Sequence, residues 1–392
     1  MINADLIFFD AGGGHRSAAE ALRLVMEEQG GWQVRLVNLQ EQLDPIDPFR
    51  RLFGWRLQDA YNLMLKKGWT LGTGQTLRVL QAAIRLFHGQ QVRLLEECWH
   101  KNRPDLVVSV VPHFNRAIAE SLRRARPATP LVTILTDFAD YPPHFWIEPQ
   151  EQYFICGTEH AVAQARKAGI PADRIFQTSG MILRPHFYQQ RVCDRRAERE
   201  KLGLDPDLPT GLVLFGGQGA NAMLEIAERL ETAPVSLQLI FICGRNEKLA
   251  KALRRRGRVR SFVEGFTKEI PYYMQLSDFF IGKPGPGSVS EAIAMGLPVI
   301  VERNAKTLPQ ERYNADWVLQ KQVGLVVRGP RDIPAAVKLL LEPANLVGFR
   351  ARTAAIRNRA VYEIPDILRK IVEKASGLRT AEPGKSFREQ TA

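Results

Sequence analysis

The chain has 392 residues, of which 45% are hydrophobic and 24% are charged, a composition typical of a soluble globular protein with room for two domains. Its 54 Lys and Arg against 42 Asp and Glu give a formal net charge of +12, which favours an anionic partner such as an acidic membrane, a phosphorylated substrate or nucleic acid. No Cys-x-x-Cys pair, basic leader or apolar run of roughly 18 residues is present, so we expect no zinc or redox motif, no secretory signal and no membrane span.

Short apolar runs alternate with helical patterns in the first half of the chain. We expect strands at residues 4–10, 33–39, 105–111, 131–136 and 152–156. We expect helices at residues 15–28, 115–125 and 159–168. This alternation predicts a parallel sheet covered by helices.

Residues 49–101 interrupt this alternation, because they read as helical and contain no clear strand. The stretch is rich in Trp, Phe and Leu, and between residues 50 and 101 it carries nine basic residues against three acidic ones. Basic amphipathic helices with aromatic residues are typical of proteins that bind a membrane surface. The alternative is a helical insertion that packs on its own domain and exposes a solvated basic face.

The alternation resumes after residues 183–210, a polar segment with three prolines that suits a hinge. We expect strands at residues 212–215, 237–243, 262–263, 279–281, 298–301 and 324–327. We expect helices at residues 222–230, 248–255, 288–295 and 312–319. The sequence therefore predicts an α/β protein with two Rossmann-like, doubly wound domains that face a cleft.

The predicted boundaries follow from this pattern. Residues 1–182 form an N-terminal domain for the acceptor and the membrane, residues 183–210 a linker, residues 211–375 a C-terminal domain for the donor, and residues 376–392 a disordered tail.

A glycine-rich turn, Gly12-Gly13-Gly14-His15, joins the first strand to the first helix. Glycines let the backbone approach a ligand, and a helix N-terminus favours negative charge. An imidazole with a pKa of about 6.5 is a natural general base, so His15 is a candidate base; the alternative is a polar residue that satisfies a helix end. A dinucleotide site would need Gly-x-Gly-x-x-Gly, which this turn lacks.

Two similar turns in the second half suit a diphosphate held by backbone N–H groups, at residues 215–219 and 282–288. Glu291 lies one helical turn after Ser288, where it could accept hydrogen bonds from a ribose diol or simply be a solvated carboxylate. Gln310 and Glu311 could hold sugar hydroxyls, or form an ordinary first turn of a helix.

At this point the chain resembles the diacylglycerol glycosyltransferases related to monogalactosyldiacylglycerol synthase, and more distantly the N-acetylglucosaminyltransferase of peptidoglycan precursors. The resemblance spans about residues 4–375. The matching pieces are Gly-Gly-Gly-His with Ala18-Ala19, Pro104-Asp105 before the strand ending at Ser109, Thr136-Asp137 with Trp146, Ser179-Gly180 before Pro185, Phe215-Gly216-Gly217-Gln218-Gly219, Gly244-Arg245-Asn246, Gly265-Phe266, residues 283–291, and Pro309-Gln310-Glu311.

The resemblance implies a GT-B fold and an inverting, metal-independent transfer of galactose or glucose from a UDP-sugar to a lipid, with diacylglycerol as the expected acceptor. It implies that His15 or, as a rival, Asp137 is the catalytic base. On the donor side it implies contacts from Gly217, Gln218, Gly219, Arg245, Phe266, Gly285, Gly287, Ser288, Glu291, Gln310 and Glu311. On the acceptor side it implies contacts from Gly13, Gly14 and Trp146.

Two stretches depart from the expected family pattern, at residues 111–115 and 142–144, and both face the acceptor side. We expect a cytoplasmic protein, peripheral on the inner face of an anionic membrane, that needs no cofactor or metal and binds no nucleic acid; its oligomeric state stays open. The alternatives are a UDP-sugar 2-epimerase, a transferase to a soluble acceptor, and a non-catalytic protein that binds a nucleotide sugar or a lipid.

Overall fold

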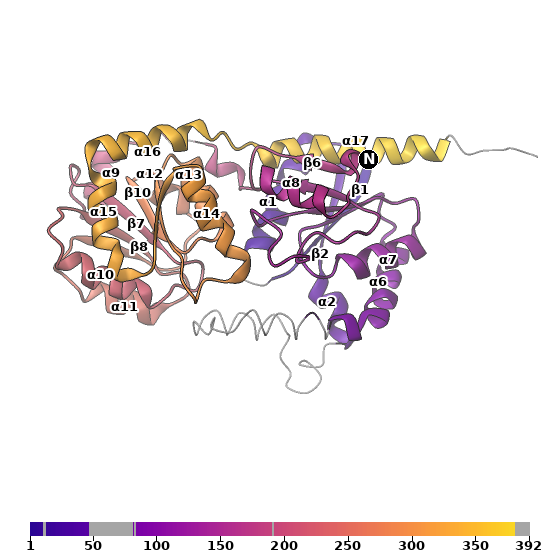
Figure 1. Ribbon diagram of the computed structural model, residues 1–392, viewed down its shortest axis with the longest axis horizontal. Helices are drawn as coiled ribbons and strands as arrows, with labels where there is room; N and C mark the ends of the chain where they lie inside the picture. Colours follow the sequence, from indigo (N-terminus) through magenta and orange to yellow (C-terminus); the bar gives the residue numbers. More distant parts are fainter. Residues whose placement is uncertain (11–12, 47–80, 82–83, 190–191, 381–392) are drawn as a thin grey trace, which may run out of the picture.

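The computed structural model describes residues 1–10, 13–46, 81, 84–189 and 192–380, and it consists of two lobes that lie side by side (Figure 1). Most of the helical insertion predicted at residues 49–101 lies outside the described residues. Its described end contains helix α6 (His88–Asn102). Within these ranges, no helix is both long and apolar enough to cross a bilayer.

A parallel sheet with strand order β2-β1-β3-β4-β5-β6 forms the centre of the N-terminal lobe. Side chains from both faces of this sheet are buried in separate apolar clusters, as expected for a parallel sheet covered by helices. The strands are β1 (Ile2–Phe8), β2 (Trp32–Asn38), β3 (Leu106–Ser109), β4 (Leu131–Ile134), β5 (Tyr153–Cys156) and β6 (Ile175–Gln177). The helices besides α6 are α1 (Gly14–Gln29), α2 (Leu39–Leu43), α7 (Asn115–Ala125) and α8 (Glu159–Lys167).

The C-terminal lobe repeats this plan with strand order β12-β11-β10-β7-β8-β9, again all parallel. The strands are β7 (Thr210–Leu214), β8 (Gln238–Ile242), β9 (Ser261–Glu264), β10 (Phe279–Gly282), β11 (Val299–Glu302) and β12 (Gly324–Val327). The helices are α9 (Arg195–Lys201), α10 (Ala222–Glu231), α11 (Glu247–Arg254), α12 (Ile270–Gln275), α13 (Pro286–Ala294), α14 (Arg312–Gln320), α15 (Ile333–Leu341) and α16 (Pro343–Ala355).

The predicted fold class is confirmed, since each lobe is a doubly wound sheet with helices on both faces. The sequence pattern of the first half did not predict strand β6. This strand has three residues and lies at the edge of the sheet without a fully buried side chain, so it lacks the apolar run that marks the other strands.

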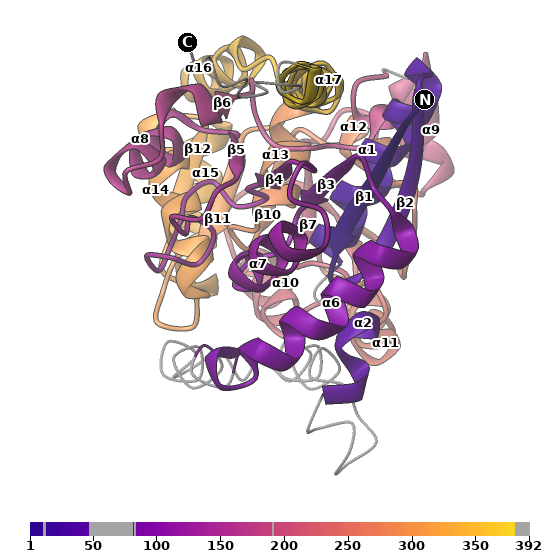
Figure 2. The ribbon, with the colours of Figure 1, turned by 90° about the vertical axis from the view of Figure 1, so that its right-hand side faces the viewer.

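The last helix, α17 (Ala360–Thr380), returns to the N-terminal lobe and lies along it (Figures 1 and 2). Ile364, Leu368 and Ile371 are buried in the same apolar cluster as strand β1. Assigning everything up to residue 375 to the C-terminal domain was therefore wrong, and residues 376–380 of the predicted tail are helical. Residues 381–392 lie outside the described residues.

Two segments of chain cross between the lobes side by side. The side chain of Asn358 donates to the carbonyl of Met181 at 2.8 Å, and the backbone N–H of Arg359 donates to Ser179 Oγ at 2.7 Å. Gly180 is packed against this contact, since an added Cβ would lie 2.6 Å from the Asn358 side chain. The lobes are therefore joined by a paired connection rather than by one linker.

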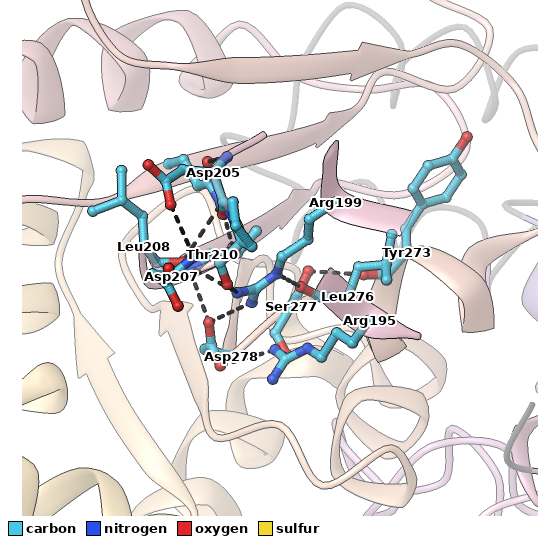
Figure 3. A network of polar contacts seen from close by, with 12 residues as sticks. Arg195, Arg199, Asp205, Asp207, Leu208, Thr210, Tyr273, Leu276, Ser277 and Asp278 are labelled. Carbon is cyan, nitrogen blue, oxygen red and sulfur yellow. Dashed lines mark hydrogen bonds and ion pairs between the residues drawn. The ribbon is translucent and has the colours of Figure 1, made fainter. Parts of the chain in front are cut away.

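The predicted linker at residues 183–210 is largely part of the C-terminal lobe. Arg199 of α9 is 5% exposed and donates to Asp278 at 2.7 Å and to the carbonyl of Leu276 at 3.0 Å (Figure 3). Burial opposes ionisation of Asp278, but the guanidiniums of Arg195 and Arg199 and the N–H of Thr210 outweigh it and lower the pKa of this carboxyl. This network fixes most of the segment to the start of β10, so a hinge over the whole segment is not what the structure shows.

Candidate active site

The strand order places one preferred ligand position in each lobe. In the first sheet β2 and β3 lie on opposite sides of β1, and in the second β8 and β10 lie on opposite sides of β7. Ligands of doubly wound sheets bind outside the carboxyl ends of the strands at such a switch point. The turns after β1, β3, β7 and β10 include residues 13–15, 110–115, 215–219 and 283–287, which contain half of the predicted site residues.

His15 lies in the first turn of helix α1. The N-cap residue of the helix is Gly13, whose φ of +82° is in the left-handed region that glycine adopts easily. The helix has no side-chain cap and no acidic residue in its first turn. Its first N–H groups are therefore available to a ligand. Ala11 and Gly12, in the same turn, lie outside the described residues.

The His15 ring is held from two sides. Its Nδ1 lies 3.2 Å from Thr136 Oγ1, and the ring also hydrogen-bonds the backbone of Val110. Burial lowers the pKa of His15 to about 4, and the bond to Val110 opposes this only in part. The imidazole is therefore neutral near pH 7, which is the form that can accept a proton.

Trp146 separates the two candidate bases. Its ring centroid lies 5.8 Å from that of His15, and its indole N–H donates to Asp137 Oδ2 at 2.9 Å. The side chain is fully buried, so the expected direct contact between Trp146 and the acceptor is not what the structure shows. Trp146 instead positions the His15 ring and the Asp137 carboxyl.

Asp137 faces the C-terminal lobe. Burial is the main reason that its pKa is raised to about 7; the bond from Trp146 lowers it, the Glu311 carboxylate raises it and the Lys283 ammonium lowers it. Two of these charges belong to the other lobe. The ionisation of Asp137 is therefore coupled to charges of the C-terminal lobe.

Lys283 and Glu311 form an ion pair within the C-terminal lobe, with Nζ 2.7 Å from Oε1. Glu311 is 7% exposed and ends the short 3-10 turn Pro309–Glu311, in which Gln310 is half-buried. Asn314 donates to the carbonyl of Pro284 at 2.7 Å and fixes the turn that carries Lys283. Gln310 and Glu311 are predicted to hold the donor sugar, and the Glu311 carboxylate already has Lys283 as its cationic partner.

The N-terminus of α13 is open and lies at the carboxyl end of β10. Gly285 is its N-cap residue, no side chain caps the helix, and its first turn has no acidic residue. A side chain added at Gly287 would meet nothing within 4 Å. In contrast, α11 is capped by Asn246 and has Glu247 in its first turn. The free N–H groups near Gly287 and Ser288 therefore suit a phosphate.

The turn after β7 packs on the turn after β8. Gly219 is buried, and an added Cβ would lie 2.7 Å from the carbonyl oxygen of Cys243, so this glycine shapes the turn. Gly217 is exposed and open, with half-buried Gln218 beside it. The backbone of Arg245 donates to Gly217 O at 3.0 Å, which joins the two turns.

Arg245 and Phe266 form the outer edge of this region. The guanidinium lies 4.8 Å from the centre of the Phe266 ring, and that side chain is 59% exposed. An exposed aromatic ring next to a cation is suited to stacking on a base and to binding a phosphate.

Glu291 is a half-buried carboxyl on α13 without a hydrogen-bond partner among the described residues. Burial raises its pKa to about 7, and the nearby Arg184 opposes the shift. Arg184 also donates to Ser17 at 3.1 Å and to Glu20 at 2.8 Å on α1. Arg184 therefore hydrogen-bonds helix α1 of the N-terminal lobe and lies near Glu291, the candidate ribose-binding residue of the C-terminal lobe.

Sequence reasoning assigned no role to Lys283 and Arg184. Lys283 lies inside the predicted glycine-rich turn at residues 282–288, so its charge was a usable signal. Arg184 had no such signal, because its partners are about 100 or more residues away in the sequence. Within the described ranges, no cluster of His, Cys, Asp and Glu is arranged to hold a metal ion.

Solved structures with a similar fold include glycosyltransferases and proteins bound to UDP. The MurG protein of Acinetobacter baumannii aligns with a TM-score of 0.63 at 12% identity, covering 94% of this chain and 99% of that one. The calicheamicin glycosyltransferase CalG4 aligns with a TM-score of 0.57 at 16% identity, covering 97% and 99%. These likenesses show the GT-B fold, and the family matches that follow make the chain a glycosyltransferase with that fold.

Residues 15–181 match the monogalactosyldiacylglycerol (MGDG) synthase family, and residues 211–342 match the glycosyltransferase family 28 C-terminal domain. The chain belongs to the MGDG synthase family, since it is 30% identical over 391 residues to the chloroplastic MGDG synthase of Spinacia oleracea, covering 94% of this chain and 72% of that protein. It is 28% identical over 396 residues to MGDG synthase 1 of Arabidopsis thaliana, covering 95% and 72%.

Proposed function

We propose that this glycosyltransferase moves galactose or glucose from a UDP-sugar to a lipid, with diacylglycerol as the simplest acceptor, and inverts the anomeric centre. The main support is the pairing of two features in the two lobes: a neutral imidazole at the open N-terminus of α1, and the open N-terminus of α13. The names of the relatives support the lipid acceptor.

In this proposal the nucleotide binds the C-terminal lobe. The N–H groups near Gly217, Gly287 and Ser288 hold the diphosphate, and Glu291 accepts hydrogen bonds from the ribose. Arg245 and Phe266 border the base. Gln310 and the Glu311–Lys283 pair hold the hydroxyls of the sugar.

The reaction would be a single displacement. His15 takes the proton of the acceptor hydroxyl while the oxygen attacks the anomeric carbon, and the bond from that carbon to the β-phosphate oxygen breaks. The open N-terminus of α13 stabilises the charge that develops on the departing UDP, which is the task that a metal ion performs in other enzymes. Metal independence is part of the proposal and is tested by adding a chelator to the assay.

The test is release of UDP by purified protein incubated with UDP-galactose or UDP-glucose and vesicles that contain diacylglycerol. We expect His15→Ala to lower kcat about a hundredfold, the usual scale for loss of a general base. His100→Ala, at an exposed position near the end of α6, is the matched control. Failure to glycosylate any lipid acceptor would overturn the proposal.

We also propose that the protein works on the inner, cytoplasmic face of an anionic membrane. The basic aromatic stretch at residues 49–101 supports this location. We expect anionic lipid to raise activity and salt near 0.5 M to remove most of that rise, because screening weakens attraction between surface charges. Binding to anionic vesicles that is insensitive to salt would contradict the role assigned to charge.

A further inference from the structure

Helix α11 and the segment that follows it carry a strong excess of positive charge. Between Arg245 and Lys268 the chain has nine basic residues and two acidic ones, Glu247 and Glu264, which is a formal excess of seven out of +12 for the whole chain. The proposed function uses only Arg245 of these nine. The remaining charge lies in the C-terminal lobe, outside the basic aromatic stretch at residues 49–101.

The basic residues of α11 lie on its outer face. Lys248, Lys251 and Arg255 are exposed, and they recur at the spacing of a single helix face. The opposite face is buried in the core of the lobe through Leu249 and Leu253. The following loop adds two more exposed cations, Arg258 and Arg260. These five basic residues form the α11 face.

Neighbouring carboxylates do not neutralise the α11 face. Glu228 and Glu231 of α10 both bond the half-buried Arg256 at 2.9 Å, so the charge of Glu231, which lies near Arg258, is already shared. None of the five residues of the face forms an ion pair within the part of the chain that the structure describes. Over residues 222–268, which include α10, ten basic residues still stand against five acidic ones. Such a surface attracts an anionic partner.

The α11 face lies on the same side of the molecule as α6. In Figures 1 and 2, which share their vertical direction, α11 lies at the lower side with α2 and α6, whereas α16 and α17 lie at the upper side. Just before α6, at the described end of the basic aromatic stretch, Leu86 is 80% exposed beside the exposed Arg85. A broad surface that contacts this side of the N-terminal lobe can therefore reach α11 as well.

A lipid surface fits this arrangement better than other anions do. A single nucleotide sugar is too small to neutralise five cations that are spread over a helix and the loop after it. Nucleic acid would explain the charge of α11 but not the exposed Leu86 on the same side. An anionic bilayer offers many head groups over a wide area, and basic residues bind it without a shaped pocket.

We propose that the α11 face is a second membrane contact, through which the C-terminal lobe binds anionic head groups of the bilayer that the N-terminal lobe also meets. The inference rests on the proposed location at an anionic membrane and adds the C-terminal lobe to it. The bilayer then orients both lobes, so anionic lipid acts on the donor half of the protein as well as on the acceptor half.

The experiment measures co-sedimentation of the full-length protein with phosphatidylcholine vesicles that contain either no phosphatidylglycerol or about one third of it. The α11 variant combines Lys248→Gln, Lys251→Gln and Arg255→Gln. The control variant loses the same charge from exposed positions on the upper side, through Arg352→Gln, Arg357→Gln and Lys370→Gln. Melting temperatures confirm that both variants are folded. A basic residue near an anionic surface strengthens binding roughly fivefold, so three of them contribute at most about a hundredfold.

We expect the α11 variant to bind anionic vesicles at least about tenfold more weakly than the wild type, and the control variant less than about threefold more weakly. Salt near 0.5 M should remove most of this difference. Equal losses in the two variants would show that only the net charge matters and would overturn the inference, as would unchanged binding of the α11 variant.

Further measurements separate this contact from the other anions and from the activity. In neutral detergent micelles both variants should keep the wild-type KM for the donor, and a raised KM in the α11 variant alone would assign the face to the nucleotide. Tighter binding of the wild type to duplex DNA than to the vesicles, lost in the α11 variant, would assign it to nucleic acid. A wild type that binds no anionic vesicle overturns the proposed location and this inference together. A wild type that binds vesicles through the α11 face but glycosylates no lipid supports the contact, and only the proposed reaction then fails.

Discussion

The pH dependence of turnover distinguishes His15 from Asp137 as the base, because burial shifts their pKa values in opposite directions, to about 4 and about 7. A general base works only when deprotonated. Lowering the pH from 8 to 5 leaves about nine-tenths of His15 deprotonated, whereas the ionised fraction of Asp137 falls from about nine-tenths to about one-hundredth. With His15 as the base, kcat changes by less than about twofold; with Asp137 it falls nearly a hundredfold.

The assay is the initial rate of UDP release at saturating donor and acceptor between pH 5 and 8. Glu291 also has a pKa of about 7, so the profile is repeated with Glu291→Gln to separate donor binding from proton transfer. We expect kcat to stay level down to pH 5 in both proteins. A tenfold fall for each pH unit below 7 that persists in Glu291→Gln would refute His15 as the base and assign the role to Asp137.

Two substitutions in the C-terminal lobe test the remaining assignments. Glu291→Gln should raise KM for the donor about tenfold with kcat nearly unchanged, because the carboxylate contributes a charged hydrogen bond to the ribose. Initial rates measured at increasing donor concentration give both constants. A loss confined to kcat would contradict the role assigned to Glu291. Lys283→Met leaves the buried Glu311 unpaired and should lower the melting temperature by about 2–8 °C, from roughly 1–2 kcal/mol after allowing for the part-exposed lysine. Adding Glu311→Gln should restore at least half of that loss in scanning calorimetry, and no recovery would show that the pair is not coupled.

Local patterns were sufficient to predict every strand of the two sheets except β6. Strands such as β3 and β7 are fully buried and therefore appear as unbroken apolar runs, and the turns after β1, β7 and β10 contain the glycines that ligand-binding turns need. Strand β6 could not be recognised in this way, because its side chains are only partly buried. The GT-B fold and most of the candidate site therefore follow from periodicity and turn chemistry, together with the family resemblance.

Features that depend on distant contacts could not be predicted. The polar, proline-containing segment around Arg199 has the composition of a linker, yet an aspartate 79 residues away fixes it to the C-terminal lobe. The periodicity of α17 gives it an apolar face but does not say which lobe that face covers. The shifted pKa values of Asp137 and Glu291 likewise come from burial in the folded protein, which composition does not reveal.

The return of α17 to the N-terminal lobe determines how the protein can be divided. A fragment that ends at residue 182 would expose the surface that Ile364, Leu368 and Ile371 cover, so the N-terminal lobe is not an independent unit when cut there. A workable fragment would join residues 360–380 back to that half through a short designed connection. Two connections, which run in opposite directions along the chain, tie the lobes together at Gly180 and Asn358.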